Sequence, residues 1–397
     1  MVPGFGAALG LLLLGATEVG AGVDATAQAG FAPIGPTEPS EPALAGILVP
    51  KAAMTTYGRR RALTLTYAPR LYIRHPNLAG SARPLLLHRG SFDYGDALTR
   101  RLRFTTELAA SAGEVDYSHQ ALVFTETQTT PAQSAVIEMA TVSAVSAVAV
   151  QSTRRLQLSL GAQAAHSRPL DATLDIATTS RVLGTAAQRY QLTRVDTLGT
   201  SLAAGQVWFD KGPRYWVVDL LGSWLHRLER EAALDLAVGA SAARLIGGDE
   251  RFLLSPAGRV NLFGPLSRGR RSALSGRLTL TLGAGFDPVL LEYVPAAGAG
   301  AGLYWQRGPH WQAGLEVDGR TAVTKAPNAT TSQQTYLSAH TFVREQLRPS
   351  LVFEYGLMAQ SRASHLAAEH FELFNREAWA YVRVSWGLRT RSGMTTP

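Results

Sequence analysis

Alternation of apolar and polar residues is the dominant pattern along this chain. In Arg277–Phe286 a leucine, alanine or phenylalanine occupies each even position, and an arginine, threonine or glycine occupies each odd one. Successive side chains of a β-strand point to opposite faces, so this segment has one apolar face and one polar face. A short basic turn, Ser267–Arg271, precedes it. Short turns followed by alternating strands recur from Arg59 onward, which predicts an all-β protein made of antiparallel hairpins.

About 15 segments carry this pattern clearly, and a weaker crossing near 181–192 brings the expected number of strands to about 16, within a range of 14–18. The clear segments are 63–74, 84–94, 102–112, 142–150, 156–164, 198–208, 216–224, 234–242, 252–263, 277–286, 297–306, 311–323, 336–344, 351–360 and 378–388. Pro69 predicts a bulge in the first of them. Short turns at 151–155, 307–310 and 344–348 contrast with longer connections at 114–134, 166–195, 325–334 and 362–375.

The N-terminal part has a different composition. Residues 5–16 form an apolar block with the length of a signal-peptide core, although no lysine or arginine precedes it, and small residues at 25–29 offer cleavage sites. Residues 31–50 contain five prolines, which is typical of a linker. We therefore predict a signal peptide at 1–29, a proline-rich periplasmic linker at 30–58, a barrel at 59–390 and a C-terminal tail at 391–397.

Composition favours a membrane barrel over the main alternative, a soluble β-sandwich or propeller. Charged residues make up 17% of the chain, below the quarter or so that is usual in soluble proteins. No apolar run after the N-terminus approaches the ~18 residues of a membrane helix, and the predicted strands, of about 10–13 residues, match tilted bilayer crossings better than ordinary strands. All seven tryptophans lie in or beside strands. These features predict a transmembrane antiparallel up-and-down β-barrel in a bacterial outer membrane.

The formal charge of +8 comes largely from small clusters of arginine at turns, such as 59–61, 100–103 and 268–271. Scattered clusters of this kind argue against a nucleic-acid partner. We expect the turn arginines to be solvated or to contact head groups, with outer-membrane lipid and lipopolysaccharide as partners. The chain has no cysteine, which excludes disulfides and thiol catalysis.

No sequence motif for catalysis, a cofactor or a metal is present, and we expect no enzyme. The glycine-rich run 298–302 continues as a strand, which indicates small residues lining a wall rather than a phosphate loop. His365 and His370 have poor spacing for a metal site. Two pairs at the barrel rim, Asp116 with His119 and His88 with Asp93, leave a rim-active enzyme as one alternative, and a structural or adhesive barrel is another.

The polar faces of the strands predict the lining of a pore. A charged side chain facing lipid near the bilayer midplane would cost about 2–4 kcal/mol, so the charged faces should point inward. The candidate lumen-facing residues are Arg101, Arg103, Glu107, Arg155, Asp235, Arg259, Arg277, Glu316, Asp318 and Arg320. A lumen with both signs of charge suits polar solutes or a hydrated polysaccharide. Alternatively, these charges pair with one another and only stabilise the inner wall.

The region from about Arg59 to Leu388 resembles outer-membrane β-barrel proteins, and 378–388 is similar to their aromatic-rich closing strand. The segments LTLTYAPRLYIR (63–74), RPLLLHR (83–89) and LTRRLRF (98–104) are similar to porin-like barrels of gliding soil bacteria. Some of those barrels accompany polysaccharide-export proteins that lack their own outer-membrane span. The resemblance implies export of a surface polysaccharide together with a periplasmic polysaccharide-export protein, and it assigns no functional residue.

Overall fold

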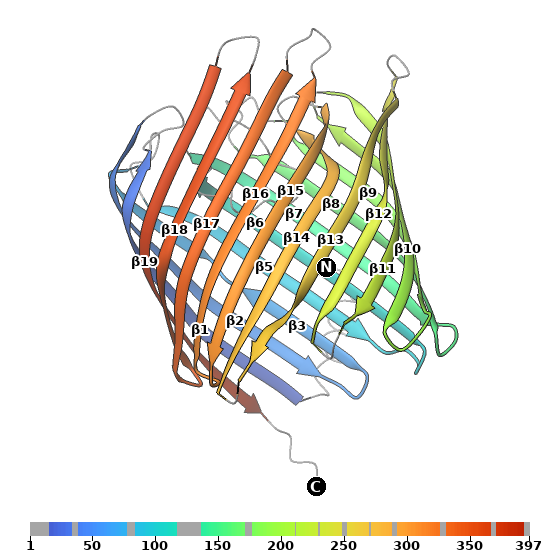
Figure 1. Cartoon of the computed structure of the whole chain (residues 1–397), viewed down its shortest axis with the longest axis horizontal. Helices are drawn as coiled ribbons and strands as arrows, with labels where there is room; N and C mark the ends of the chain where they lie inside the picture. The colour runs from blue at the N-terminus through green and yellow to red at the C-terminus, as the bar shows by residue number, and fades with distance from the viewer. Residues whose placement is uncertain are drawn as a thin grey trace, which may run out of the picture.

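The chain forms one closed antiparallel β-barrel in the computed structural model (Figure 1). The structure describes residues 16–33, 39–77, 84–116, 136–170, 177–210, 212–228, 231–247, 252–269, 271–287, 292–325, 331–366 and 371–392. The strands are β1 (Ala16–Pro33), β2 (Ser40–Tyr57), β3 (Arg61–Tyr67), β4 (Arg70–His75), β5 (Leu85–Asp96), β6 (Leu102–Asp116), β7 (Val136–Gln151), β8 (Leu156–Pro169), β9 (Thr179–Gln191), β10 (Asp196–Phe209), β11 (Arg214–Arg227), β12 (Ala233–Ile246), β13 (Phe252–Arg268), β14 (Ser272–Asp287), β15 (Glu292–Arg307), β16 (Trp311–Lys325), β17 (Thr331–Arg348), β18 (Leu351–Leu366) and β19 (Phe371–Ser392). Among these residues there is no helix long and apolar enough to cross a membrane.

Neighbours along the chain pair with each other, and pairing of β1 with β19 closes the ring. In Figure 1 the yellow to red strands β13–β19 lie in front of the blue and cyan strands from the first part of the chain. β3 and β4 are two segments of one crossing, because β2 and β5 each pair with both. The interruption lies at Ala68 and Pro69, where a bulge was expected. The 19 strands thus make 18 crossings, at the upper end of the predicted range, and the predicted fold class is confirmed.

The prediction of a proline-rich linker at 30–58 is wrong, because Ser40–Tyr57 is strand β2. Its prolines lie where a missing N–H is tolerated. β2 pairs with β4 at Leu44–Leu48 and with β3 at Ala52–Tyr57, so Pro50 falls opposite the break between β3 and β4. Pro42 lies beyond the end of the β4 pairing. Counting prolines without knowing which edge of the strand is paired therefore gave the wrong assignment.

The predicted end of the signal peptide at residue 29 falls inside β1, which pairs with β2 and β19 along most of its length. Cleavage there would remove most of β1 and open the ring. Residues 1–15, which include most of the apolar block, lie outside the described residues, and an export signal stays a prediction. At the other end β19 continues to Ser392, past the predicted boundary at 390; residues 393–397 lie outside the described part.

The weak crossing near 181–192 is present as β9, and three predicted connections are shorter than expected. The predicted loop 166–195 contains the end of β8 and all of β9. Strand β17 begins at Thr331, and β18 and β19 together occupy most of 362–375. Polar residues are frequent on both faces of these segments, so alternation is weak there and the strands resemble loops in sequence.

The two ends of the barrel differ. The short-turn end holds the connections 58–60, 97–101, 152–155, 192–195, 228–232, 269–271, 308–310 and 349–350, together with the start of β1 and the end of β19. The long-loop end holds the other connections, of which 117–135 is the longest. This alternation of short and longer connections is typical of outer-membrane barrels, whose short turns face the periplasm.

One face of every strand exposes large apolar side chains. Leu160, Val238 and Leu357 are 68%, 74% and 59% exposed, and they belong to strands far apart around the ring. Trp216, Trp305 and Trp386 share this exposed register. A closed barrel whose outward face is an apolar belt satisfies its backbone internally and places that belt in lipid. These features confirm the predicted outer-membrane β-barrel.

Candidate functional site

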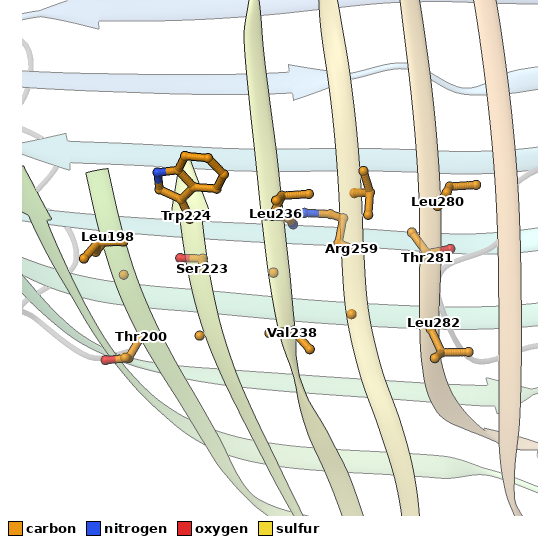
Figure 2. Close-up of a pocket in the computed structure, with 15 residues that line it drawn as sticks. Leu198, Thr200, Ser223, Trp224, Leu236, Val238, Arg259, Leu280, Thr281 and Leu282 are labelled. Atoms are coloured by element: carbon orange, nitrogen blue, oxygen red, sulfur yellow. The ribbon is translucent and has the colours of Figure 1, made fainter. Parts of the chain in front are cut away.

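The face opposite the apolar belt is the inner face of the barrel. Eight of the ten sequence-predicted lumen residues lie on it within strands, and the other two, Arg101 and Arg155, lie in short turns. On β14 Leu278, Leu280 and Leu282 are exposed in the outward register, and Arg277 is in the other one. Figure 2 shows the same alternation in Leu280, Thr281 and Leu282. Cross-strand pairing carries the inner register from Arg277 to Gly302 of β15 and then to Glu316 of β16. A role for these residues in solute passage stays a prediction.

The structure brings some of these predicted residues together and leaves others apart. Asp235 of β12 and Arg259 of β13 form an ion pair of 2.9 Å. Glu316, Asp318 and Arg320 follow one another on the inner face of β16. Arg103 and Glu107 share the inner face of β6. The last two, Arg101 and Arg155, lie in short turns, directly before β6 and β8.

A network of hydrogen bonds spans the inner face from β15 to β19. Its centre is Glu354 of β18, whose side chain is 8% exposed. Arg344 of β17 donates to Glu354 through Nε at 2.8 Å and Nη2 at 2.5 Å. The hydroxyl of Tyr381 on β19 donates to the other carboxylate oxygen at 3.1 Å. Two donors on flanking strands thus fix this carboxylate, and a bond between charged partners is roughly twice as strong as a neutral one.

His340 of β17 extends the network toward β15. Its Nε2 lies 2.6 Å from the Tyr381 hydroxyl, which already gives its only proton to Glu354, so Nε2 carries a hydrogen and donates. Its Nδ1 faces Glu316 at 3.6 Å, and Glu316 accepts a 2.6 Å bond from the hydroxyl of Tyr304. The imidazole also stacks on the ring of Tyr381, with centroids 5.6 Å apart. Aromatic rings and carboxylates therefore alternate along this wall.

Glycines of β15 make room for the wall. Gly298, Gly300 and Gly302 all belong to the inner register. A Cβ at Gly300 would meet the Oδ1 of Asp318 at 2.2 Å, and a Cβ at Gly298 would meet the Cγ of Arg320 at 3.3 Å. The side chains of β16 therefore lie across a strip of bare backbone. The prediction that this glycine run lines a wall agrees with its place here.

A second charged group crosses the seam that closes the barrel. Asp24 of β1 accepts from Lys51 of β2 and from Nη2 of Arg383 on β19, the latter at 2.9 Å. Sequence reasoning missed this group, because Asp24 was assigned to a signal peptide and Lys51 to a linker. It also missed His340, Glu354 and the inner-facing tyrosines. The alternation in 336–344 and 351–360 was a usable signal for them, since both segments had been recognised as strands.

A third group lies on the inner face nearer the long-loop end. Glu377 of β19 accepts from Gln360 and from Nε1 of Trp379, the latter at 2.8 Å. Trp379 is 1% exposed and belongs to a hydrophobic cluster with Ala32, Ala43, Ala45, Tyr72 and Leu85. A similar cluster on the far wall contains Ala177, Val207, Phe209, Tyr215, Val217, Ala243 and Tyr293. The inner face is therefore polar in its middle and apolar toward the long-loop end.

Of the two side-chain pairs considered for catalysis, only His88 with Asp93 lies within the described residues, and it is not assembled. His88 belongs to the outward register of β5, where its Nδ1 lies 2.7 Å from the hydroxyl of Tyr67, and Asp93 belongs to the inner register. For the other pair, His119 lies outside the described residues. So does His370, which was weighed with His365. Within the described part of the chain, no cluster of three or more histidine, aspartate or glutamate side chains could hold a metal ion.

A groove on the wall formed by β10–β14 is separate from these polar groups. Most of its lining is of the outward register, including Leu198, Trp224, Val238 and Leu282 (Figure 2). Gly222 and Gly258 also belong to the lining. Its walls are almost wholly apolar, so it is part of the belt that contacts lipid and not a site for a polar solute.

Comparison with known proteins identifies no family for this chain. No family model and no curated protein matches the chain. One similar solved structure is OccAB2 of Acinetobacter baumannii, with 9% identity over 94% of this chain and 98% of that one, and a TM-score of 0.47. Another is the outer membrane protein OpdK of Pseudomonas aeruginosa, with 12% identity over 94% of this chain and 99% of that one, and a TM-score of 0.45. A third is the copper transporter OprC, with 8% identity over 93% of this chain and 80% of that one, and a TM-score of 0.48. With TM-scores below 0.5 and identities of 12% or less, these similarities carry no conclusion about this chain.

Proposed function

We propose that this protein is a pore that lets polar solutes cross the outer membrane. The observation that carries the proposal is the contrast between the two faces of one closed wall. The outward face exposes leucine and valine, and the inner face holds the charged network around Glu354 and His340. A carboxylate, an imidazole and guanidinium groups at mid-wall suit contact with water and hydroxylated solutes.

The solute we favour is a polysaccharide or its fragments. Tyr304 and His340 are partly exposed beside Glu316, whose side chain is 35% exposed and offers a hydrogen-bond acceptor. Sugar units carry both apolar C–H surfaces and hydroxyl groups, so both kinds of contact are useful to them. A periplasmic polysaccharide-export protein at the short-turn end would deliver the polysaccharide to the pore. Lipid and lipopolysaccharide would surround the apolar belt.

Conductance of the refolded protein in planar bilayers tests the pore. We expect stable ohmic channels in the full-length chain, and swelling of proteoliposomes in linear glucose oligomers. Replacement of the mid-wall acids, Glu316→Gln with Glu354→Gln, should slow oligomer uptake about two- to fivefold, which corresponds to a fraction of one to about 1 kcal/mol. Glu345→Gln, on the outward register of β17, is the matched control and should leave uptake unchanged.

Two results would count against these proposals separately. A refolded barrel with neither conductance nor swelling would overturn the pore. Channels that pass salt but exclude every sugar oligomer, together with unaltered surface polysaccharide after deletion of the gene, would retain the pore and overturn polysaccharide as its cargo.

A further inference from the structure

The mouth of the lumen at the short-turn end carries inner-face arginines that are not neutralised by acids. Arg103 of β6, Arg189 of β9 and Arg227 of β11 each lie within three residues of the end of their strand. Arg277 lies further in, as the sixth residue of β14. All four side chains are exposed. They come from four strands between β6 and β14, so they line one arc of the mouth, about half of the ring. We call them the mouth arginines.

Each mouth arginine belongs to the inner register and faces a very small residue on one of its two neighbouring strands. On the other side, Arg189 faces Gln157 and Arg277 faces Phe263. Arg103 is opposite Ala149, and Arg189 is opposite Gly199. Continuing around the ring, the remaining two stand opposite small partners as well: Arg227 with Ala233 and Arg277 with Gly302. A Cβ on Gly199 would lie 3.7 Å from the Cγ of Arg189, so the arginine stem runs along the wall over the glycine. Small partners leave the long side chains free to extend into the lumen.

The mouth arginines differ in their partners from three other arginines of the inner face, although one of those, Arg344, lies at least as near to the end of its strand as Arg277 does. Arg259, Arg344 and Arg383 each hold a carboxylate on a neighbouring strand at 2.9 Å or less. Among the described residues, none of the four mouth arginines has a carboxylate within 4.0 Å, and Arg277 has only a 3.4 Å bond from its Nε to the hydroxyl of Thr279. An arginine paired with a carboxylate mainly stabilises the wall. The positive charge of an unpaired arginine remains available to attract an anion.

The turns at this end add cations of the same kind. Arg59, Arg101, Arg154, Arg155 and Arg194 are exposed and have no carboxylate partner among the described residues. Carboxylates on the inner face near this end are fewer. Asp235 and Glu354 are already paired with arginine, and Asp93 and Glu107 face each other across β5 and β6. Glu316 lies in the same cross-strand row as Arg277 and accepts a hydrogen bond from Tyr304. A narrow low-dielectric passage lined by one sign of charge concentrates ions of the other sign.

We propose that this end of the lumen is an anion-collecting mouth, and that the solute carries carboxylate, phosphate or sulfate groups. This rests on the proposed pore and names the charge class of its cargo. Guanidinium groups bind all three of these anions through paired N–H donors. The inner register places the mouth arginines out of contact with lipid, so a solute in the lumen is their partner. Lipid head groups can reach only the arginines of the turns.

Ion selectivity of single channels tests the proposal. In a potassium chloride gradient we expect chloride to permeate better than potassium, most clearly at low salt, where screening is weak. The triple variant R103Q/R189Q/R227Q should lower the chloride-to-potassium permeability ratio by about threefold or more. The matched control R59Q/R154Q/R194Q removes the same charge from turns outside the strands and should change the ratio much less.

Sidedness gives a second readout. Because the chain has no cysteine, Pro309→Cys in the β15–β16 turn reports orientation through its reaction with a membrane-impermeant thiol reagent added to one side. Citrate added at the short-turn side should block the current at a concentration at least about tenfold lower than citrate added at the other side. The triple variant should lose this difference.

Each other outcome overturns the mouth. Channels of normal conductance without anion preference, or with a preference that the triple variant does not alter, would overturn the mouth and leave the pore standing. If the turn control alone changes the behaviour, and only in bilayers that contain anionic lipid, the arginines serve head groups and not a solute. Absence of any channel would overturn the pore and the mouth together.

Discussion

At the scale of single residues, the inner wall depends on a few carboxylates that each hold more than one donor. Glu354 satisfies both Arg344 and Tyr381, and Glu377 satisfies both Gln360 and Trp379. Loss of one such acceptor leaves two donors unpaired at once. Substitution of these carboxylates should therefore lower the free energy of unfolding by more than substitution of an ordinary polar residue.

Glu354→Gln should destabilise the barrel by about 1–2 kcal/mol, since Arg344 loses its charged partner while remaining half exposed to water. Urea unfolding of the protein in lipid vesicles, followed by tryptophan fluorescence, measures this. Glu345→Gln, an exposed acid on β17, should change the unfolding free energy by less than about 0.5 kcal/mol. Equal effects of the two changes would mean that the network does not stabilise the wall.

Trp379 and Trp386 lie on the same strand, and they provide a second pair. Trp379 is 1% exposed and donates to Glu377, and Trp386 is 41% exposed on the belt. Trp379→Phe should cost about 2 kcal/mol through a lost hydrogen bond and incomplete packing, while Trp386→Phe should cost well under 1 kcal/mol. The same unfolding assay compares them. A larger loss at Trp386 would contradict the assignment of the inner face.

At the scale of elements, β1 is the strand on which closure of the barrel depends. It forms one side of the closing seam, and the Asp24 group bridges that seam from β2 to β19. The same residues read as the end of an export signal when only composition and small-residue cleavage sites are considered. As a strand of the seam, β1 would be present in the mature protein, whereas as the end of an export signal it would be removed.

Ala27→Cys with Val382→Cys should form a disulfide in the assembled barrel. These residues face each other across β1 and β19 in the outward register, and opposed Cα atoms lie about 4.5–5.5 Å apart, within disulfide range. Non-reducing electrophoresis after mild oxidation measures the cross-link against a cysteine-free background. Ala27→Cys with Val384→Cys is a diagonal pair and should cross-link poorly. Failure of the opposed pair would indicate that β1 is absent from the mature wall.

At the scale of the whole molecule, the sequence predicted the all-β barrel and most of its strands. Eight of the ten candidate lumen residues lie on the inner register of strands, and their role in solute passage stays a prediction. Strict alternation, as in Arg277–Phe286, is a local signal, so a single sequence reveals it. The network was not predictable in the same way. His340, Tyr381 and Glu354 meet only because three strands have a particular register, and alternation says which face a residue takes but not which residue it faces. Pro50 shows the same limit, since its effect depends on a break in the neighbouring strand.

The orientation of the barrel gives a prediction for intact cells. With the short turns in the periplasm, Glu41→Cys near the long-loop end should react with a bulky membrane-impermeant maleimide added to cells. Pro309→Cys should react only after the outer membrane is permeabilised. Gel shifts of the two variants measure this, and the reverse pattern of labelling would invert the assignment of the two ends.

Closure of the ring by β1 and β19 has a consequence for biogenesis. Thr17 pairs with Ser392, so the seam joins the two extremes of the polypeptide and cannot form before the last strand has been synthesised. Until then every partial sheet has two open edges, whose free amide and carbonyl groups are costly in lipid and invite pairing with other chains. Contacts this distant in sequence also form slowly. An external template for the edges would therefore protect the unfinished sheet, and we expect delivery to an insertion machinery to limit the yield of this protein in cells.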